Sequence, residues 1–281
     1  MEHQVTESPD ERADEQWPEE KRQGALSILI RHRELIASLI LRDIRARYKQ
    51  SVLGIAWALL QPLAMMIIYT VVFSHIVRVD TGEIPYPVFS YIALLPWTFF
   101  SQSVVAGTEC LVSNFSLITK IYFPREVFPI SAVLGKTVDL GLGILVLVPL
   151  FVIYSIQPTW MIIVIVPVLL VQLCLMLGLT FLLSSFNLFY RDVRHIVPLL
   201  TTMWMYLTPI IYPLNLVPKK YLAIYMLNPM VPVMDTYRKV ALQGEPPMWG
   251  YLGISATISV LALIVGYRVF KRLEPAFAEL I

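Results

Sequence analysis

The sequence predicts an all-α integral membrane protein with six transmembrane helices, flanked by amphipathic and re-entrant segments. Composition is the first indication: 57% of the 281 residues are hydrophobic, only 15% are charged, and the mean hydropathy is +0.67. Soluble domains carry about 25% charged residues. The second indication is a series of apolar runs long enough to cross a bilayer, and the third is the uneven distribution of lysine and arginine along the chain.

The first 25 residues are predicted to be a disordered acidic tail, because they hold many acidic and few apolar side chains. Residues 26–50 are predicted to form an amphipathic helix that lies in the membrane interface. Its apolar side chains recur at helical spacing: Leu35, Ile36, Leu39, Ile40 and Ile44. Its basic side chains occupy another face: Arg42, Arg45, Arg47 and Lys49. These basic residues suit lipid headgroups, although a simple positive-inside anchor has the same pattern.

A transmembrane domain is expected over 51–272, followed by a cytoplasmic tail at 273–281. A spanning helix needs roughly 17–25 residues, and the fifth of the predicted spans is short by this measure. The predicted spans are 55–76, 88–105, 128–154, 160–188, 196–211 and 252–270.

The stretch at 209–247 is rich in proline and still apolar, which is unusual for a continuous helix. Short re-entrant helices over 212–248 explain this composition, since broken helices are tolerated at membrane depth when protein buries them. An ordinary extracytoplasmic loop is the alternative.

Lysine and arginine predict the orientation. With both termini in the cytoplasm, most basic residues fall on the inner flanks, at 31–49, 120–125, 191–194 and 268–272, and few fall outside, at 78, 219–220 and 238–239. The positive-inside rule therefore places the segment 114–126 on the cytoplasmic side.

This segment is predicted to form a short helix with one apolar face, made by Leu117, Ile118, Ile121 and Tyr122. Pro124 ends the helix. The apolar face is expected to pack either into the groove of a partner protein or against the protein's own inner surface.

Two charges lie inside the third predicted span. Lys136 and Asp139 have the i, i+3 spacing of a pair on one helix face. Intramembrane charges are costly and usually face a cavity or a packed interior. A structural pair and a transport role both remain open.

Aromatic side chains are frequent in the first, second and fifth predicted spans. Sugars stack on aromatic faces, so these residues could line a path for saccharides, but aromatic belts at the membrane interfaces explain them as well. They are Trp57, Tyr69, Phe73, Tyr91, Trp97, Phe99, Phe100, Trp204 and Tyr206.

The sequence holds no pair of catalytic carboxylates beside a base and no metal-ligand cluster, so neither an enzyme nor a metal site is predicted. Gly135-Lys136-Thr137 resembles the end of a phosphate-binding loop, but Ile130 replaces the first glycine and the stretch lies within a span. If the protein uses ATP, a partner subunit must bind it.

Several stretches together resemble one family, the membrane subunit of bacterial ATP-binding-cassette exporters of lipid-linked polysaccharide. Those exporters move O-antigen, capsular polysaccharide or teichoic acid. The stretches that carry the resemblance occur in a fixed order, at 42–49, 52–62, 95–100, 119–127, 187–193, 207–212 and 227–230.

The resemblance implies a homodimer in the cytoplasmic membrane, with two copies of an ATPase subunit that binds ATP and Mg²⁺. It implies that 114–126 is a coupling helix, which would contact the ATPase through Ser116, Leu117, Ile118, Lys120, Ile121, Tyr122, Arg125 and Glu126. It implies entry of the lipid pyrophosphate beside Arg42, Arg45, Arg47 and Lys49. The glycan would then pass a pore lined by the aromatic residues listed above.

Three other functions fit parts of the pattern: an exporter of a drug or small lipid, a membrane enzyme acting on polyprenyl phosphate, and an ATP-independent carrier. The missing nucleotide-binding loop favours a subunit of a larger machine over a self-contained carrier. An enzyme is expected to gather Asp, Glu or His at one membrane face, and the sequence does not.

Overall fold

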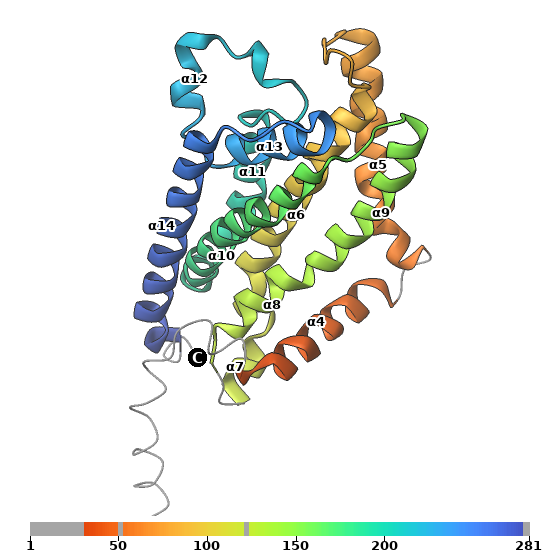
Figure 1. Cartoon of the computed structure of the whole chain (residues 1–281). Coiled ribbons are helices and arrows are strands. Elements are labelled where there is room, and N and C mark those ends of the chain that lie inside the picture. The colour runs from red at the N-terminus through yellow and green to blue at the C-terminus, as the bar shows by residue number, and fades with distance from the viewer. Residues whose placement is uncertain (1–30, 50–52, 121–123, 278–281) are drawn as a thin grey trace, which may run out of the picture.

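The structure, a computed structural model, describes residues 31–49, 53–120 and 124–277. Over these ranges the chain is helical and contains no β-strand (Figure 1). The α-helices are α4 (Arg33–Tyr48), α5 (Trp57–Tyr69), α6 (Tyr86–Ser113), α7 (Phe115–Lys120), α8 (Val127–Gly135), α9 (Thr137–Ile153), α10 (Ile165–Phe189), α11 (Val193–Tyr206), α12 (Lys219–Tyr225), α13 (Met230–Arg238) and α14 (Trp249–Leu273). Short 3₁₀ or π segments are η1 (Gly54–Ala56), η2 (Thr70–Ile76), η3 (Trp160–Val164), η4 (Leu214–Leu216), η5 (Lys239–Gln243) and η6 (Pro275–Phe277). The predicted tail at 1–25 lies outside the described residues.

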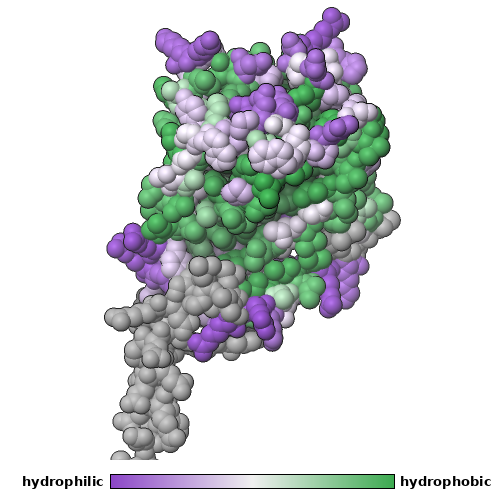
Figure 2. All heavy atoms as spheres, viewed as in Figure 1, coloured by the Kyte–Doolittle hydropathy of each residue, from purple (hydrophilic) through white to green (hydrophobic). Residues whose placement is uncertain are grey.

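Five helical stretches of the described chain are long and apolar enough to cross a membrane: Trp57–Ile76, Tyr86–Ser113, Val127–Ile153, Trp160–Phe189 and Trp249–Leu273. On the face that Figure 2 shows, hydrophobic side chains form a broad band between two more hydrophilic ends. The predicted span at 196–211 is not among the five, because α11 has only 14 residues. At 1.5 Å per residue such a helix is about 21 Å long, less than the roughly 30 Å of a hydrocarbon core.

The end of the molecule that carries α4, α7 and the last turn of α14 is called the inner end here, and the end that carries α12 the outer end (Figure 1). Helix α6 runs between these ends at the centre of the bundle and packs against α5, α8, α9, α10, α11 and α13. Most of its side chains are buried, although its sequence is no more apolar than its neighbours'. The helices around α6 therefore present their other faces to the surroundings.

Helices α10 and α14 form the most extensive helix contact, and they meet through glycine. Gly178 of α10 and Gly266 of α14 face each other so closely that their backbones touch. Small residues at a crossing let two membrane helices approach in this way and gain packing contacts.

Helix α11 begins near the inner end. The Asn187 side-chain amide donates to the carbonyl of Thr108, 3.0 Å away, and its oxygen accepts from the Arg194 backbone N–H at 3.1 Å. The turn after α11 reaches the outer end of α6, where the Tyr86 hydroxyl donates to the carbonyl of Ile211 at 2.7 Å. The segment from α11 to Ile211 therefore extends along most of α6.

The predicted re-entrant region contains η4, α12, α13 and η5. Every residue of α13 is buried, and the helix packs among α6, α10 and α14. Its Tyr237 hydroxyl donates at 3.0 Å to the buried Gln172, whose amide donates in turn to the carbonyl of Pro96 at 2.7 Å. These paired polar groups fix α13 inside the bundle, where unpaired ones would be costly.

The third predicted span consists of two helices separated by a single residue. Helix α8 ends at Gly135 and α9 begins at Thr137, so Lys136 lies at the junction of two helices. The pair that the i, i+3 spacing predicts is nevertheless present, because Lys136 Nζ lies 3.5 Å from Asp139 Oδ2. The backbone at Lys136 remains helical, with φ −81° and ψ −12°, so α8 and α9 together still form one apolar stretch long enough to cross a membrane.

Candidate functional site

Two adjoining cavities open along the side of the bundle between α4, α5, α6, α9 and α11. The inner cavity has a volume of about 400 Å³ and is lined by Arg47, Trp57, Ala58, Gln61, Pro62, Leu95, Thr98, Phe99, Gln102, Lys136, Asp139 and Leu140. The second, which we call the aromatic cavity, has a volume of about 540 Å³. Both are lined by Gln61, Thr98, Gln102 and Lys136, so they form one continuous groove.

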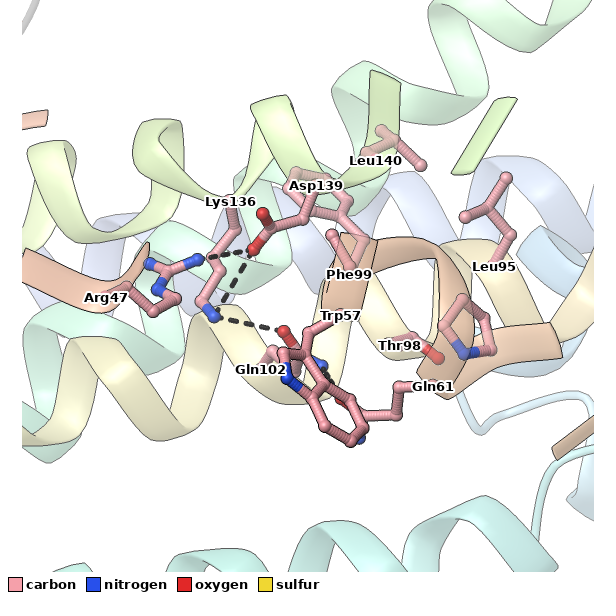
Figure 3. Close-up of a pocket in the computed structure, with 12 residues that line it drawn as sticks. Arg47, Trp57, Gln61, Leu95, Thr98, Phe99, Gln102, Lys136, Asp139 and Leu140 are labelled. Carbon is pink, nitrogen blue, oxygen red and sulfur yellow. Dashed lines mark hydrogen bonds and ion pairs between the residues drawn. The ribbon is translucent and has the colours of Figure 1, made fainter. Parts of the chain in front are cut away.

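A polar network crosses the inner cavity (Figure 3). Arg47 Nη1 of α4 lies 2.6 Å from Asp139 Oδ2 of α9, and Lys136 Nζ lies 3.5 Å from the same oxygen. Lys136 Nζ also donates to Gln102 Oε1 of α6 at 3.0 Å, and the Gln102 amide donates to Gln61 Oε1 of α5 at 3.4 Å. The network thus joins α4, α5 and α6, which follow one another along the chain, to α9.

The aromatic cavity holds three of the predicted aromatic residues, Tyr69, Trp97 and Tyr206. Trp57 and Phe99 line the inner cavity. Rings from α5, α6 and α11 therefore border the groove, which gives it apolar faces suited to flat or ring-shaped ligands.

The other predicted aromatic residues pack within the protein. Tyr91 and Phe100 are fully buried, and Tyr91 donates to the carbonyl of Gly143 at 3.0 Å. The Phe100 ring centroid lies 5.2 Å from that of Trp204, and Phe73 stacks on Tyr86. Hydropathy could not separate these core rings from the rings along the groove, since both sets lie in apolar helices.

The predicted basic set on α4 divides into two groups. Arg42 donates to Asn114 Oδ1 at 2.5 Å and to its neighbour Asp43 at 2.7 Å, while Arg45 and Lys49 are exposed. Arg47 points instead toward Asp139 in the inner cavity. The apolar side chains of α4, among them Ile36 and Leu39, pack on α8 and its neighbours.

In the predicted coupling segment, α7 carries Leu117 and Ile118 partly buried against the protein's own inner core. Leu117 and Ile118 therefore pack against the protein's own surface, which is one of the two packing partners expected for this face. Ser116 is exposed. Lys120 is the last residue of α7, and the predictions for Ile121 and Tyr122 lie outside the described residues.

Arg125 and Glu126 attach the start of α8 to the end of α14. The Glu126 carboxylate is buried and forms an ion pair with Lys271, which also lies 2.9 Å from Glu274. Arg125 donates to the carbonyl of Glu274 and lies 5.8 Å from the ring of Phe277. This connection was not predicted from the sequence, where only Lys271 and Glu274 have the spacing of a helical ion pair.

Arg238 is a functional candidate that the charge pattern of the sequence presents only as one of the outer basic residues. Its guanidinium is buried, donates to the carbonyls of Phe89, Pro209, Ile210 and Tyr212, and lies 3.8 Å from the Phe89 ring centroid. Burial lowers the pKa of Arg238 to about 9, and the Asp235 carboxylate opposes that fall. Through its hydrogen bonds to Pro209, Ile210 and Tyr212, the group fixes the turn after α11.

Among the residues that the structure describes, no group of three or more His, Cys, Asp or Glu side chains could hold a metal ion. The groove offers cations, amides and aromatic rings, and its described walls lack a nucleophile beside a base. This chemistry suits the binding and passage of an anionic or hydroxyl-rich molecule.

Comparison with known proteins relates the whole arrangement to one family. A family model described as ABC-2 type transporter matches residues 34–242. The chain is 34% identical over 253 residues to the O-antigen export system permease protein RfbA of Myxococcus xanthus, covering 89% of this chain and 96% of that protein. It is 29% identical over 249 residues to RfbA of Klebsiella pneumoniae, covering 88% of this chain and 95% of that protein. It is 25% identical over 252 residues to the polysialic acid transport protein KpsM of Escherichia coli, covering 86% of this chain and 94% of that protein.

Proposed function

Since this chain belongs to the ABC-2 type transporter family, we propose that it is the permease of an ATP-driven exporter of O-antigen or capsular polysaccharide. It is a transport subunit and not an enzyme. The observation that carries the proposal is the similarity to an O-antigen export permease along nearly the whole of both chains. The groove with its aromatic border supports it, because sugar rings pack on such faces.

In this proposal the chain crosses the inner membrane six times. The sixth crossing is α11 together with the turn up to Ile211, which extends along most of α6. An even number of crossings agrees with α4 and the last turn of α14 lying at the same end of the molecule (Figure 1). Both termini are then cytoplasmic, and α12 and α13 form re-entrant helices at the outer end.

Two copies of the chain form the pore. Exposed apolar side chains cover the free faces of α5 and α11, among them Ile67, Ile68, Leu199 and Met203. A second copy set against these faces would enclose the groove, with Trp57, Tyr69, Trp97, Phe99 and Tyr206 beside the passing glycan. The lipid pyrophosphate would approach along the basic face of α4, past Arg42, Arg45 and Lys49.

ATP and Mg²⁺ are bound by a partner ATPase, which docks at the inner end against α7. The buried connection from Glu126 to Lys271 supports transmission of the ATPase's movement into the helix bundle, because it joins the start of α8 to α14.

Loss of the gene is expected to remove the surface polysaccharide and to cause lipid-linked glycan to accumulate in the inner membrane. The wild-type gene should restore export, and an unchanged surface in the deletion strain would disprove the function.

Replacing Ser116 with tryptophan is expected to weaken association with the ATPase by roughly tenfold, equivalent to about 1.4 kcal/mol. The reason is steric, because a bulky ring on the exposed side of α7 prevents close approach. Copurification of the two subunits measures the effect. Leu117→Asp is a poorer test, since Leu117 packs against the protein's own core.

The matched control is Lys220→Trp, which adds the same ring at an exposed position of α12, at the outer end. This variant should bind the ATPase as the wild type does. Equal copurification of both variants with the ATPase would argue against docking at α7.

A further inference from the structure

The inner cavity places two basic side chains around one carboxylate. Only 12% of the Lys136 side chain and 16% of the Asp139 side chain are exposed, compared with 33% for Arg47. Charges so far from water interact more strongly than charges in bulk solvent. Lysine and arginine outnumber acidic residues on the described walls of this cavity, so its field favours a further anion.

Lys136 lies deep in the molecule. The helix that leads to it begins at Val127, so Lys136 is about 14 Å along the axis from the inner end of α8. An intramembrane lysine is costly and is usually retained where it faces a cavity or a partner. Here Lys136 lines both cavities of the groove.

The chemistry of the groove changes with position. Arg47 provides a cation in the inner cavity and Lys136 provides a second one where that cavity meets the junction, and both suit phosphate oxygens. Gln61, Thr98 and Gln102 line the junction of the two cavities and provide amide and hydroxyl groups. Beyond the junction the aromatic cavity begins. A molecule with a phosphate at one end and sugars beyond it would match this order.

We infer that the inner cavity binds the phosphate of the lipid carrier through Lys136 and Arg47, while Asp139 is the resident counter-ion that the phosphate displaces. The sugars next to the phosphate lie on Gln61, Thr98 and Gln102 and continue into the aromatic cavity. This inference rests on the proposed function and adds the site at which the carrier is recognised. Headgroup phosphates of bilayer phospholipids have the same chemistry, so the experiment includes them.

The test measures equilibrium binding of radiolabelled farnesyl pyrophosphate to the purified permease–ATPase complex in phosphatidylcholine nanodiscs. Lys136→Gln removes the cation and keeps hydrogen-bonding capacity, and should weaken binding roughly ten- to a hundredfold. Asp139→Asn removes the competing charge and should tighten binding several-fold. Lys220→Gln, an exposed lysine on α12, should bind as the wild type does.

Lys136→Gln should weaken binding of farnesyl pyrophosphate, and Asp139→Asn should tighten it. These opposite effects separate ligand binding from a structural role, because either change would weaken binding if the two residues formed only a structural pair. If Lys136→Gln fails to assemble, the tighter binding of Asp139→Asn still tests the site. Wild-type affinity in Lys136→Gln, or weaker binding in Asp139→Asn, would overturn the inference.

Nanodiscs that contain phosphatidylglycerol distinguish the two phosphate sources. Binding of farnesyl pyrophosphate should persist in them, and full competition by phosphatidylglycerol would overturn the assignment to the carrier. Surface polysaccharide in the deletion strain is measured separately. A strain that exports normally without the gene refutes the proposed function, whereas loss of Lys136 dependence refutes only the site.

Discussion

Replacing Gly266 with alanine is expected to lower the free energy of unfolding by roughly 3 kcal/mol or more, the upper range for overpacked cores. The added Cβ would lie 2.1 Å from the carbonyl oxygen of Gly178. The obstacle is backbone and not a flexible side chain, so α10 and α14 must separate along their whole contact. Thermal unfolding of the purified protein in detergent measures the loss, and the yield of folded protein should fall with it.

Gly253→Ala in the same helix is the control. A Cβ at Gly253 would meet nothing within 4 Å, so the substitution adds a better helix former without a clash. It should leave stability unchanged or raise it by up to about 1 kcal/mol. If the Gly253 and Gly266 variants unfolded at the same temperature, the close contact between α10 and α14 would not be what the glycines provide.

Replacing Arg238 with methionine is expected to cost roughly 3 kcal/mol or more of stability and to abolish export. The substitution keeps an apolar stem of similar length but leaves the carbonyls of Phe89, Pro209, Ile210 and Tyr212 without their donor. Each buried group left unpaired costs about 1–3 kcal/mol. Thermal unfolding and surface polysaccharide in the complemented deletion strain measure the two effects.

The neighbouring Lys239→Met is the matched control. Lys239 is partly exposed and pairs with Asp235 at 2.9 Å within one helical stretch. Partly exposed pairs of this kind contribute about 1 kcal/mol or less. An export defect equal to that of Arg238→Met would mean that positive charge at the outer end is required, and not the bonds that fix the turn after α11.

The long helices and α4 were predictable because their signals are local. Apolar length predicts the five long spans, and helical spacing predicts which side of α4 is buried, with Ile36 and Leu39 inside. The division of the third span into α8 and α9 was not predictable from length or hydropathy, since the two helices together have the length of one span.

It was harder to predict which side chains are buried within the protein than to predict which segments are helical. Lipid is as apolar as a protein core, so hydropathy cannot tell a ring that faces the groove from one in the core, as with Trp57 and Phe100. The charges of Arg238 and Glu126 gave a misleading prediction of exposure, because the sequence places Arg238 on the outer surface and Glu126 on the inner surface. Both are buried because their partners, backbone carbonyls for one and Lys271 for the other, lie far away in sequence.

The attachment of Glu126 to Lys271 connects the start of α8 to two separate parts of the helix bundle. One is α8 with α9, which follow it along the chain, and the other is α14, which the ion pair joins to it. Because α14 and α10 meet backbone to backbone, these two helices are expected to move together. Among the described residues of these two parts, only those of the first border the groove, through Lys136, Asp139 and Leu140. A movement of one part relative to the other would therefore change the shape of the groove.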